Sequence, residues 1–440
     1  MAVPTDCVDV AVVGAGQAGL SVSHELSRAG VEHAVLERSR VGQAWRQRWD
    51  SFCLVIPNWT VQLPGGRYRG DDPDGFMPRD DIVGHLAGYA RSFHAPVREG
   101  TDVFWLGLCG DGRFLLRTST GDIRAREVVI ASGAYQRPHR PALSRELPGS
   151  LLVIDAEDYT RPTALPAGKV LVVGSGQTGC QLAEELAESG RDVYLACGSA
   201  PWIPRRIEGR DTIAWLAETS HFDVTLADLP SPLARLGANP QASGRDGGHD
   251  LNYRTLQAMR VNLRGRLAGV EDGKAYFAAD LAESVAFGDA RYADLCGLIA
   301  ASCVQHGLRA PEMPPPPRFR AGPVGPLDLR DVAAVVFTAG YRPDYQRWVG
   351  FPRAVDDLGF PIQKDGSSTV IAGLHFMGVP FQRKRKSATL LGVAEDAAVL
   401  AETIVAKRTK RTVPRQRPTE PENARGNASL LASHSTCSRE

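Results

Sequence analysis

A short glycine-rich pattern, G-x-G-x-x-G, occurs twice in this chain, each time directly after a run of apolar residues. The first copy follows residues 10–13, and its glycines are Gly14, Gly16 and Gly19. The second copy follows residues 169–173, and its glycines are Gly174, Gly176 and Gly179. A segment with helical character follows each copy, residues 20–28 and residues 180–189. The pattern therefore predicts two strand–turn–helix units of the same build.

Each glycine of such a unit has its own role in holding a dinucleotide. The first permits a tight turn, the second lets the backbone approach the pyrophosphate, and the third lets the helix pack closely on the strand. The N-terminus of the helix offers free N–H groups to the phosphates. Glu37 ends a strand expected over residues 31–36, close to the spacing of about 20 residues at which an acid takes the ribose hydroxyls. One such pattern could be an ordinary turn, but two in matched contexts predict two bound nucleotides.

The composition argues against several other classes of protein. The chain has 51 Lys and Arg against 50 Asp and Glu, so its net charge of +1 predicts neither a nucleic-acid nor a membrane partner. Its 440 residues suit two or three domains. No apolar run approaches the ~20 residues of a membrane span, and we expect no signal peptide and a cytoplasmic location. The eight cysteines are scattered without a C-x-x-C pair, which predicts reduced thiols and no metal site.

The second glycine unit indicates which nicotinamide nucleotide it would hold. The ribose 2′ position is read at the end of the second strand, which we expect over residues 192–196, and no Asp or Glu stands at that end. Ser199, Arg205 and Arg206 lie just beyond and would suit a 2′-phosphate. We therefore expect NADPH rather than NADH. The alternative is that the two arginines form a solvated basic turn, since arginine is usually exposed.

An apolar segment after the first unit contains candidates for the reacting site. Asn58, Thr60 and Gln62 stand among apolar residues between Pro57 and Pro64. They could face a flavin ring or the place where oxygen reacts, and Asn58 and Gln62 are our candidates for catalytic residues. The alternative is that nearby backbone groups satisfy these side chains. Three tryptophans of the region could line a flat ring system or simply fill the core: Trp45, Trp49 and Trp59.

The rest of the chain predicts a coarse succession of elements. We expect further strands over residues 103–106, 114–117, 124–131, 332–340 and 371–380. We expect helices over residues 77–93, 213–218, 292–306 and 392–404. Residues 211–310 are the hardest to interpret, and residues 311–326 form a proline-rich strap. Residues 411–440 are basic, then polar and proline-rich, and are expected to be disordered.

Together these motifs resemble those of the class B flavin monooxygenases. This family includes the flavin-containing monooxygenases, the plant auxin-biosynthetic monooxygenases and their bacterial relatives. The resemblance covers residues 7–405. Besides the two glycine motifs and Glu37, its features are residues 42–45, residues 57–64, residues 131–133 with Pro138 and Pro141, residues 338–344, residues 378–380 and residues 391–396.

The resemblance implies a set of residues that contact the cofactors, in addition to the glycines named above. These residues are Gln17, Ala18, Glu37, Arg38, Gln43, Ala44, Trp45, Val103, Ala131, Gly133, Gln177, Thr178, Ser199, Arg205, Arg206, Ala339, Gly340 and Leu391. The sequence departs from the family's pattern at two places. Asp155 stands where the family usually has a His shortly before an aromatic residue, here Tyr159, which argues against Baeyer–Villiger ring insertion. Cys197 and Gly198 stand where the family often has an arginine.

The resemblance also implies an activity and an architecture. The activity is an FAD- and NADPH-dependent monooxygenase that transfers one oxygen atom of O2 to a small organic substrate through a flavin peroxide. The fold is α/β with two Rossmann-like dinucleotide-binding domains: an FAD domain, residues 1–160 and 331–410, with an NADPH domain, residues 161–330, inserted. Two alternatives stay open: an FAD/NAD(P)H oxidoreductase without oxygen transfer, and a nucleotide-binding redox regulator. A homodimer is compatible with all three.

Overall fold

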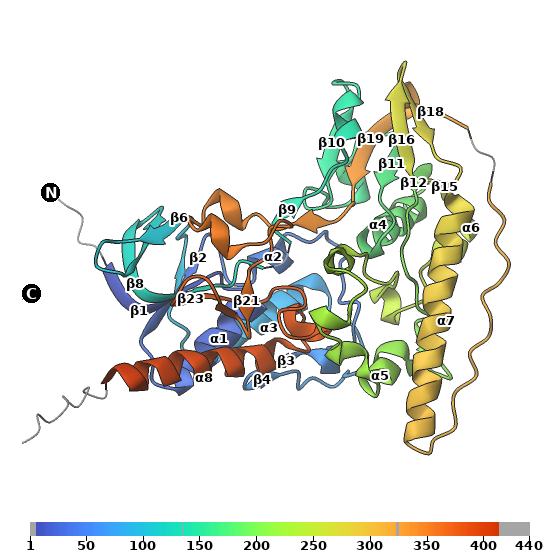
Figure 1. The fold of residues 1–440 in the computed structure, drawn as a ribbon. Coiled ribbons are helices and arrows are strands. Elements are labelled where there is room, and N and C mark those ends of the chain that lie inside the picture. Colours follow the sequence, from blue (N-terminus) through green and yellow to red (C-terminus); the bar gives the residue numbers. More distant parts are fainter. Residues whose placement is uncertain (1–5, 134, 323–324, 413–440) are drawn as a thin grey trace, which may run out of the picture.

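The chain folds around two sheets that lie side by side, each flanked by helices (Figure 1). The computed structural model describes residues 6–133, 135–322 and 325–412. Both sheets have parallel strands at their centre, and in each a glycine turn leads from an inner strand into a helix. The expected α/β fold with two Rossmann-like units is therefore confirmed.

The larger sheet has nine strands among the described residues. Their bounds are β1 (Asp6–Val13), β2 (His33–Glu37), β5 (Val97–Glu99), β6 (Val103–Leu108), β7 (Phe114–Thr118), β8 (Gly121–Ile130), β21 (Gln363–Lys364), β22 (Ser367–Ser368) and β23 (Leu374–Phe376). The order is β21-β22-β23-β8-β1-β2-β5, and β7 joins β6 to β8. The neighbours from β23 to β5 are parallel, whereas β6, β7, β21 and β22 pair antiparallel.

Strand β1 is apolar on both faces because both faces of the sheet are covered. Val10 and Val12 belong to a buried cluster that includes residues of α1 (Gln17–Arg28), α3 (Arg79–Ser92) and α8 (Val393–Thr412). Ala11 and Val13 alternate with them and belong to a second cluster, formed with β6 and β7. This arrangement fixes where β1 ends and the first glycine turn begins.

The second sheet has five parallel strands within the described part of the chain, in the order β10-β19-β11-β12-β15. Their bounds are β10 (Leu152–Asp155), β11 (Lys169–Val173), β12 (Val193–Ala196), β15 (Asn262–Arg264) and β19 (Val332–Phe337). Val170 and Val172 lie in the same buried cluster as residues of α4 (Gln177–Glu188). Leu171 and Val173 pack on the other face, against a three-stranded antiparallel sheet of β16 (Leu267–Glu271), β17 (Lys274–Phe277) and β18 (Leu327–Asp328).

Two adjacent crossings connect the sheets. The chain leaves the larger sheet after β8 through β9 (Arg137–Pro138) and returns after β19 through β20 (Tyr341–Arg342). The two segments pair as an antiparallel ribbon, with Tyr341 opposite Pro138. Sheet membership consequently differs from the expected domain boundaries at two strands, because β10 and β19 both lie in the second sheet. A buried parallel strand has the same apolar composition in either sheet, so its sequence does not identify its partner.

Four further α-helices and two short hairpins of the described residues lie outside these sheets. They are α2 (Gln43–Arg46), α5 (Thr212–Ala217), α6 (Tyr253–Ala258), α7 (Leu281–Gln305) and the hairpins β3 (Gln62–Leu63) with β4 (Gly66–Arg67) and β13 (Arg206–Ile207) with β14 (Arg210–Asp211). Helix α7 begins well before the helix expected from Tyr292. It contains Gly288, which discourages a helix in sequence but here lies against Trp202, where a Cβ would approach the ring to 2.9 Å.

Two further expectations concern the proline-rich strap and the segment after residue 410. The strap over residues 311–322 runs back beside α7 (Figure 1), and the hydroxyl of Tyr292 donates to the carbonyl oxygen of Pro314. Helix α8 continues through residues 411 and 412, and the rest of the segment expected to be disordered lies outside the described residues. Among the described helices, none combines the length and the apolar character needed to cross a membrane.

Candidate functional site

The first glycine turn is shaped by two close approaches of the backbone. Gly14 has a φ of +107°, and a Cβ there would lie 2.6 Å from the carbonyl oxygen of Ala131. A Cβ at Gly19 would overlap the carbonyl oxygen of Gly14. A Cβ at Gly16, in contrast, would meet nothing within 4 Å. The outer glycines therefore serve packing, and the middle one faces open space.

The N-terminus of α1 borders this open space. Among the described residues, no side chain caps this helix, and its first turn contains no acidic residue. A helix begins with N–H groups that have no partner inside the helix, and together with the helix dipole these favour an anion. The turn is thus suited to a pyrophosphate, as its sequence predicts.

Glu37 ties this turn to the end of β2. Its carboxylate is buried, and it accepts hydrogen bonds from the main-chain N–H of Ala15 at 2.8 Å and of Ser39 at 3.0 Å. The acid lies beside the glycine turn, at the position expected for a residue that meets a ribose.

The segment after Gly42 returns to the start of α1. Gly42 has a φ of +72°, and its N–H donates to the carbonyl oxygen of Ala15 at 3.0 Å. The indole N–H of Trp45 donates to the side-chain oxygen of Gln17 at 3.0 Å. Gln17 in turn reaches the carbonyl oxygen of Ala388 at 3.5 Å. The resemblance implied that Gln17 and Trp45 both contact the cofactor, and in the structure their side chains are hydrogen-bonded to each other.

The other residues expected to contact FAD lie at several places around the larger sheet, some buried and some exposed. Ala18 is buried in α1, and Gly133 follows β8 with a φ of +89°. Gln43 and Ala44 lie on α2, and Ala44 and Arg38 are exposed. Val103 lies on β6, and its side chain belongs to the buried cluster that β1, β6 and β7 share.

Asn58 has a different role from the one expected. Its side chain is 3% exposed, its amide nitrogen donates to the carbonyl oxygen of Asp72 at 2.9 Å, and its oxygen accepts from the N–H of Met77 at 2.7 Å. The amide therefore holds the loop over residues 58–77 in place. This corrects the expectation of a catalytic Asn58, because both ends of its amide are used by the backbone.

Gln62 lies at a cavity of about 390 Å³. The walls come from β3, β4, α5 and the start of α8: Gln62, Leu63, Pro64, Gly65, Arg67, Ala217, Thr219, Phe222, Asp223, Lys386, Leu391, Ala394 and Glu395. The main-chain N–H of Gln62 donates to the carbonyl oxygen of Leu390 at 3.1 Å. Gln62 and Leu391, both expected at the site, therefore share one cavity, whose volume falls within the ~300–1,000 Å³ range of small-molecule sites.

The second glycine turn repeats the geometry of the first. Gly174 has a φ of +109°, and a Cβ there would lie 2.8 Å from the carbonyl oxygen of Thr338, just after β19. Ala339 lies against the same turn, since its N atom would be 3.0 Å from that Cβ. A Cβ at Gly179 would lie 2.7 Å from the hydroxyl of Thr338. Each turn is thus closed by the residues that follow the neighbouring strand, Ala131 in one sheet and Thr338 in the other.

The second turn is covered where the first is open. A Cβ at Gly176 would lie 3.4 Å from that of Ala238. Residues 237–243, which we call the covering segment, are held by three glutamine side chains. Gln177 donates to the carbonyl oxygen of Pro240, Gln181 to that of Ala242, and Gln241 to that of Ser175. The sequence shows no sign of this segment, because its contacts depend on the folding of a distant loop.

Arg205 and Arg206 do not lie at the end of β12. Arg205 is 2% exposed, pairs with Asp211 at 2.7 Å and donates to the carbonyl oxygen of Val55 at 2.9 Å. Arg206 donates to the carbonyl oxygens of Gly247 and Gly248 at 2.8 and 2.9 Å. The expected 2′-phosphate contacts of both arginines are therefore wrong, because the β13–β14 hairpin directs them toward other loops.

Ser199 does lie beyond the end of β12, and an arginine from elsewhere in the chain meets it. The guanidinium of Arg266 donates to the hydroxyl of Ser199 at 2.8 Å. Arg266 follows β15, the strand that pairs with β12. Sequence reasoning missed Arg266 because only the pairing of β12 with β15 brings it here.

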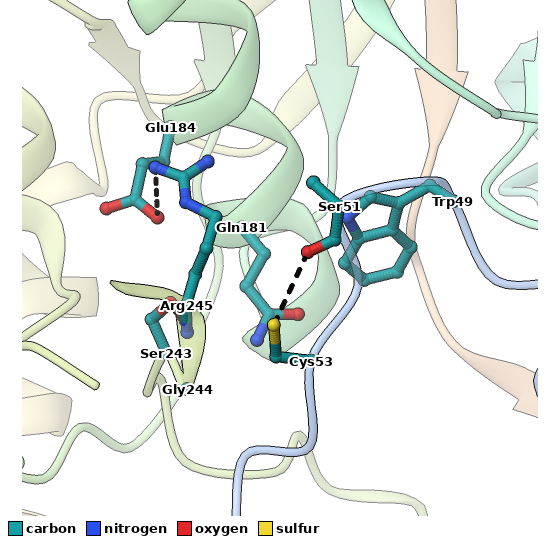
Figure 2. Close-up of a pocket in the computed structure, with 8 residues that line it drawn as sticks. All are labelled: Trp49, Ser51, Cys53, Gln181, Glu184, Ser243, Gly244 and Arg245. Carbon is teal, nitrogen blue, oxygen red and sulfur yellow. Dashed lines mark hydrogen bonds and ion pairs between the residues drawn. The ribbon is translucent and has the colours of Figure 1, made fainter. Parts of the chain in front are cut away.

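A second, smaller pocket lies between residues 49–53 and α4 (Figure 2). Its free volume of about 10 Å³ is that of a single water. Buried Glu184 accepts from the ring of His249 at 2.7 Å and lies 3.7 Å from Arg245. The hydrogen bond to Glu184 raises the pKa of His249. This pocket is a packed polar contact between the two units and offers no room for a substrate.

The chain is similar in sequence to oxidoreductases and monooxygenases. The family model described as pyridine nucleotide-disulphide oxidoreductase matches residues 11–218. An uncharacterized CzcO-like oxidoreductase of Geobacillus kaustophilus is 29% identical over 400 residues, which cover 90% of this chain and 98% of the relative. Indole-3-pyruvate monooxygenase YUCCA4 of Oryza sativa is 28% identical over 243 residues, which cover 49% of this chain and 55% of that protein.

Solved structures share the fold. A flavin-containing monooxygenase from Stenotrophomonas maltophilia superposes with a TM-score of 0.64 at 18% identity, covering 92% of this chain and all 100% of that chain. Bacillithiol disulfide reductase from Staphylococcus aureus superposes with a TM-score of 0.60 at 13% identity, with coverage of 92% and 100%. The two nucleotide turns, the buried Glu37 and these similarities support a flavin-dependent oxidoreductase that is similar to the flavin-containing and YUCCA monooxygenases.

Proposed function

We propose that this protein is an FAD- and NADPH-dependent monooxygenase that transfers one oxygen atom of O2 to a small organic molecule. Its relatives named as monooxygenases support the reaction class. The observation that carries the proposal is the loop over residues 388–391. This loop contacts Gln17 at the first glycine turn and also lines the 390 Å³ cavity through Leu391. One loop thus joins the nucleotide turn to a cavity of substrate size.

The residues of the first turn fit FAD. Open space in front of Gly16 and the uncapped start of α1 would receive the pyrophosphate, and Glu37 would meet the ribose. Bound FAD would accept hydride from NADPH and activate O2, which is chemistry that amino-acid side chains do not supply. The resident groups would then bind and orient. Trp45, held by Gln17, would border the cofactor.

The cavity beside Gln62 and Leu391 is where we propose that the substrate binds. Apolar residues such as Leu63 and Phe222 would exclude water from the reacting centre. Gln62 would supply a hydrogen bond at this wall through its side-chain oxygen, because its nitrogen donates to the carbonyl oxygen of Trp59. We keep Gln62 as the candidate that touches substrate and assign Asn58 a positioning role.

Rapid mixing tests the proposal. FAD-loaded protein is reduced with NADPH, mixed with oxygenated buffer and followed by absorbance, with indole-3-pyruvate as the first substrate because a relative is named for it. We expect a delay with a distinct spectrum before oxidised flavin returns, and an oxygenated product by mass. Immediate return of oxidised flavin with one equivalent of hydrogen peroxide, with every substrate of a broad screen, would contradict the proposal.

The second candidate is a reductase that passes electrons to another acceptor. The disulfide reductase that shares the fold favours it. The thiols offer less support, since Cys180 and Cys197 are buried and burial raises the pKa of both. A reductase would oxidise NADPH faster with a quinone or disulfide acceptor than with O2. The same assays also test the redox-regulator alternative, which predicts negligible NADPH oxidation.

We further propose that the FAD part and the inserted NADPH part meet at the β9–β20 ribbon, with β10 and β19 counted in the NADPH part. A cytoplasmic location and a small-molecule substrate complete the proposal. Size-exclusion chromatography with light scattering would decide between a monomer and a homodimer.

A further inference from the structure

The turn after β12 is held by hydrogen bonds to its backbone. The N–H of Gly198 donates to the hydroxyl of Ser175 at 2.8 Å, and the hydroxyl of Tyr253 donates to the carbonyl oxygen of Gly198 at 2.6 Å. The exposed Ser199 follows. In a Rossmann unit, the end of this strand is where the adenine ribose and its 2′ substituent lie. This chain therefore presents a fixed backbone and a hydroxyl at that place.

Among the described residues, Arg266 is the one cationic side chain with a hydrogen bond to the hydroxyl of Ser199. Its Nη2 donates to Ser199 at 2.8 Å, and its Nε lies 3.7 Å from the position that a Cβ on Gly198 would take. The edge of the guanidinium that carries Nε and Nη2 thus faces the turn. This edge is the fork with which arginine binds phosphate through two parallel hydrogen bonds.

A carboxylate holds Arg266 in this orientation. Asp280 accepts from Nη1 of Arg266 at 2.6 Å and from its main-chain N–H at 2.9 Å. A Cβ at Gly265 would overlap Asp280 and the carbonyl oxygen of Ala278, so glycine is needed for this approach. The side chain of Arg266 is nevertheless 53% exposed. Asp280 thus holds the guanidinium through Nη1, and the edge with Nε and Nη2 is open to a ligand.

We propose that Arg266 and Ser199 form the subsite for the 2′-phosphate of NADPH and set the preference for NADPH over NADH. The inference rests on the proposed function, because it assumes a nicotinamide nucleotide at the second glycine turn. Arg266 follows β15, the strand that pairs with β12. It would take the role of the arginine that the class B flavin monooxygenases often have where this chain has Cys197 and Gly198. The phosphate would accept from Nε and Nη2 of Arg266. The hydrogen bond from Nη1 to Asp280 would therefore stay in place.

The test uses FAD-loaded, full-length protein and two probes, adenosine 2′,5′-bisphosphate and 5′-AMP, titrated by calorimetry. We expect the wild type to bind the bisphosphate more tightly than 5′-AMP. Arg266→Gln should weaken binding of the bisphosphate about 10- to 100-fold, as the loss of a charge-assisted hydrogen bond predicts, and leave 5′-AMP unchanged. Arg266→Lys keeps the charge without the fork and should retain part of the preference.

Arg330→Gln is the matched control, because Arg330 is also an exposed arginine paired with an aspartate, Asp328. It should bind both probes as the wild type does. Loss of the preference in Arg206→Gln but not in Arg266→Gln, or equal binding of the two probes by the wild type, would overturn the assignment and leave the nucleotide site intact. A wild type that binds neither probe would overturn the proposed nucleotide site itself, and the assignment with it.

Discussion

The carboxylate of Glu37 accepts a hydrogen bond of 2.8 Å from the main-chain N–H of Ala15, in the middle of the first glycine turn. The second oxygen accepts from Ser39 at 3.0 Å. An acid commonly assigned to a ribose thus also shapes the phosphate turn, because the turn and the end of β2 share one buried side chain. Loss of this side chain should therefore affect both functions.

Replacing Glu37 with alanine should reduce both stability and flavin binding. Two N–H groups would lose their acceptor, at a cost of about 1–3 kcal/mol for each buried group left unpaired. We expect a lower melting temperature for the flavin-free protein and weaker FAD binding in a fluorescence titration. Glu32→Gln, at an exposed position nearby in sequence, should change neither. An unchanged melting temperature in Glu37→Ala would contradict the structural part of this prediction.

Alanine at two glycines of the first turn should give opposite patterns. Gly16→Ala places a methyl group in open space, so the flavin-free protein should melt as the wild type does while FAD binding falls. Gly14→Ala requires a φ of +107° and a close contact with Ala131, so the protein should be destabilised by about 1–3 kcal/mol even without FAD. Thermal melts of apo-protein and flavin content after purification provide the measurements. Equal melting of the two variants would refute the roles assigned to these glycines.

Removing the side chain of Arg205 should destabilise the fold without altering nucleotide preference. Arg205 and Asp211 are both buried, and Arg205→Ala leaves the carboxylate of Asp211 without its cation. Breaking such a pair typically costs about 3–5 kcal/mol. Denaturant unfolding measures this loss, and Arg206→Ala, at the exposed neighbouring position, should cost far less. A shift in the ratio of NADPH to NADH turnover in folded Arg205→Ala would argue against its structural role.

Asp396 should make stability depend on pH. Burial raises the pKa of this carboxyl from 3.8 to about 6, although Arg383 lies 3.3 Å away and opposes the shift. The folded protein therefore binds the proton more tightly than the unfolded chain, so this contribution is complete below about pH 4 and is lost as the pH rises to about 6. By linkage it amounts to about 3 kcal/mol.

Asp396→Asn should remove that decline. The difference in unfolding free energy between the wild type and the variant is measured by denaturant titration at several pH values between 4 and 7. Glu402→Gln, exposed on the same helix, is the control and should follow the wild type. A wild type and Asp396→Asn with parallel pH profiles would show that the carboxyl titrates normally.

What the sequence predicts well is what local chemistry determines. The glycines at positions 14, 16 and 19 and the acid at 37 belong to one strand–turn–helix–strand unit. Their relative positions in space therefore follow from their spacing in the sequence. The same holds for the second turn. Strand and helix positions around these units follow from apolar periodicity, as in β8 and α3.

What the sequence does not predict depends on which distant segments pack together. Arg266 reaches Ser199 only because β15 pairs with β12. The covering segment over Gly176 depends on a loop whose composition is unremarkable for a surface turn. Asn58 was expected to face a cofactor, yet its partners Asp72 and Met77 lie 14 and 19 residues further along the chain, beyond the β3–β4 hairpin. Side-chain partners of this kind are set by tertiary packing, not by spacing.

The β9–β20 ribbon has a consequence for how such proteins diversify. The chain enters and leaves the second sheet at paired residues, Pro138 and Tyr341, which as antiparallel partners lie only about 5 Å apart. An insertion between these two residues can therefore lengthen the second part without moving the ends of the strands that lead into the ribbon. Exchange of the whole part would be more disruptive, because Ala217, Phe222 and Asp223 within it line the 390 Å³ cavity.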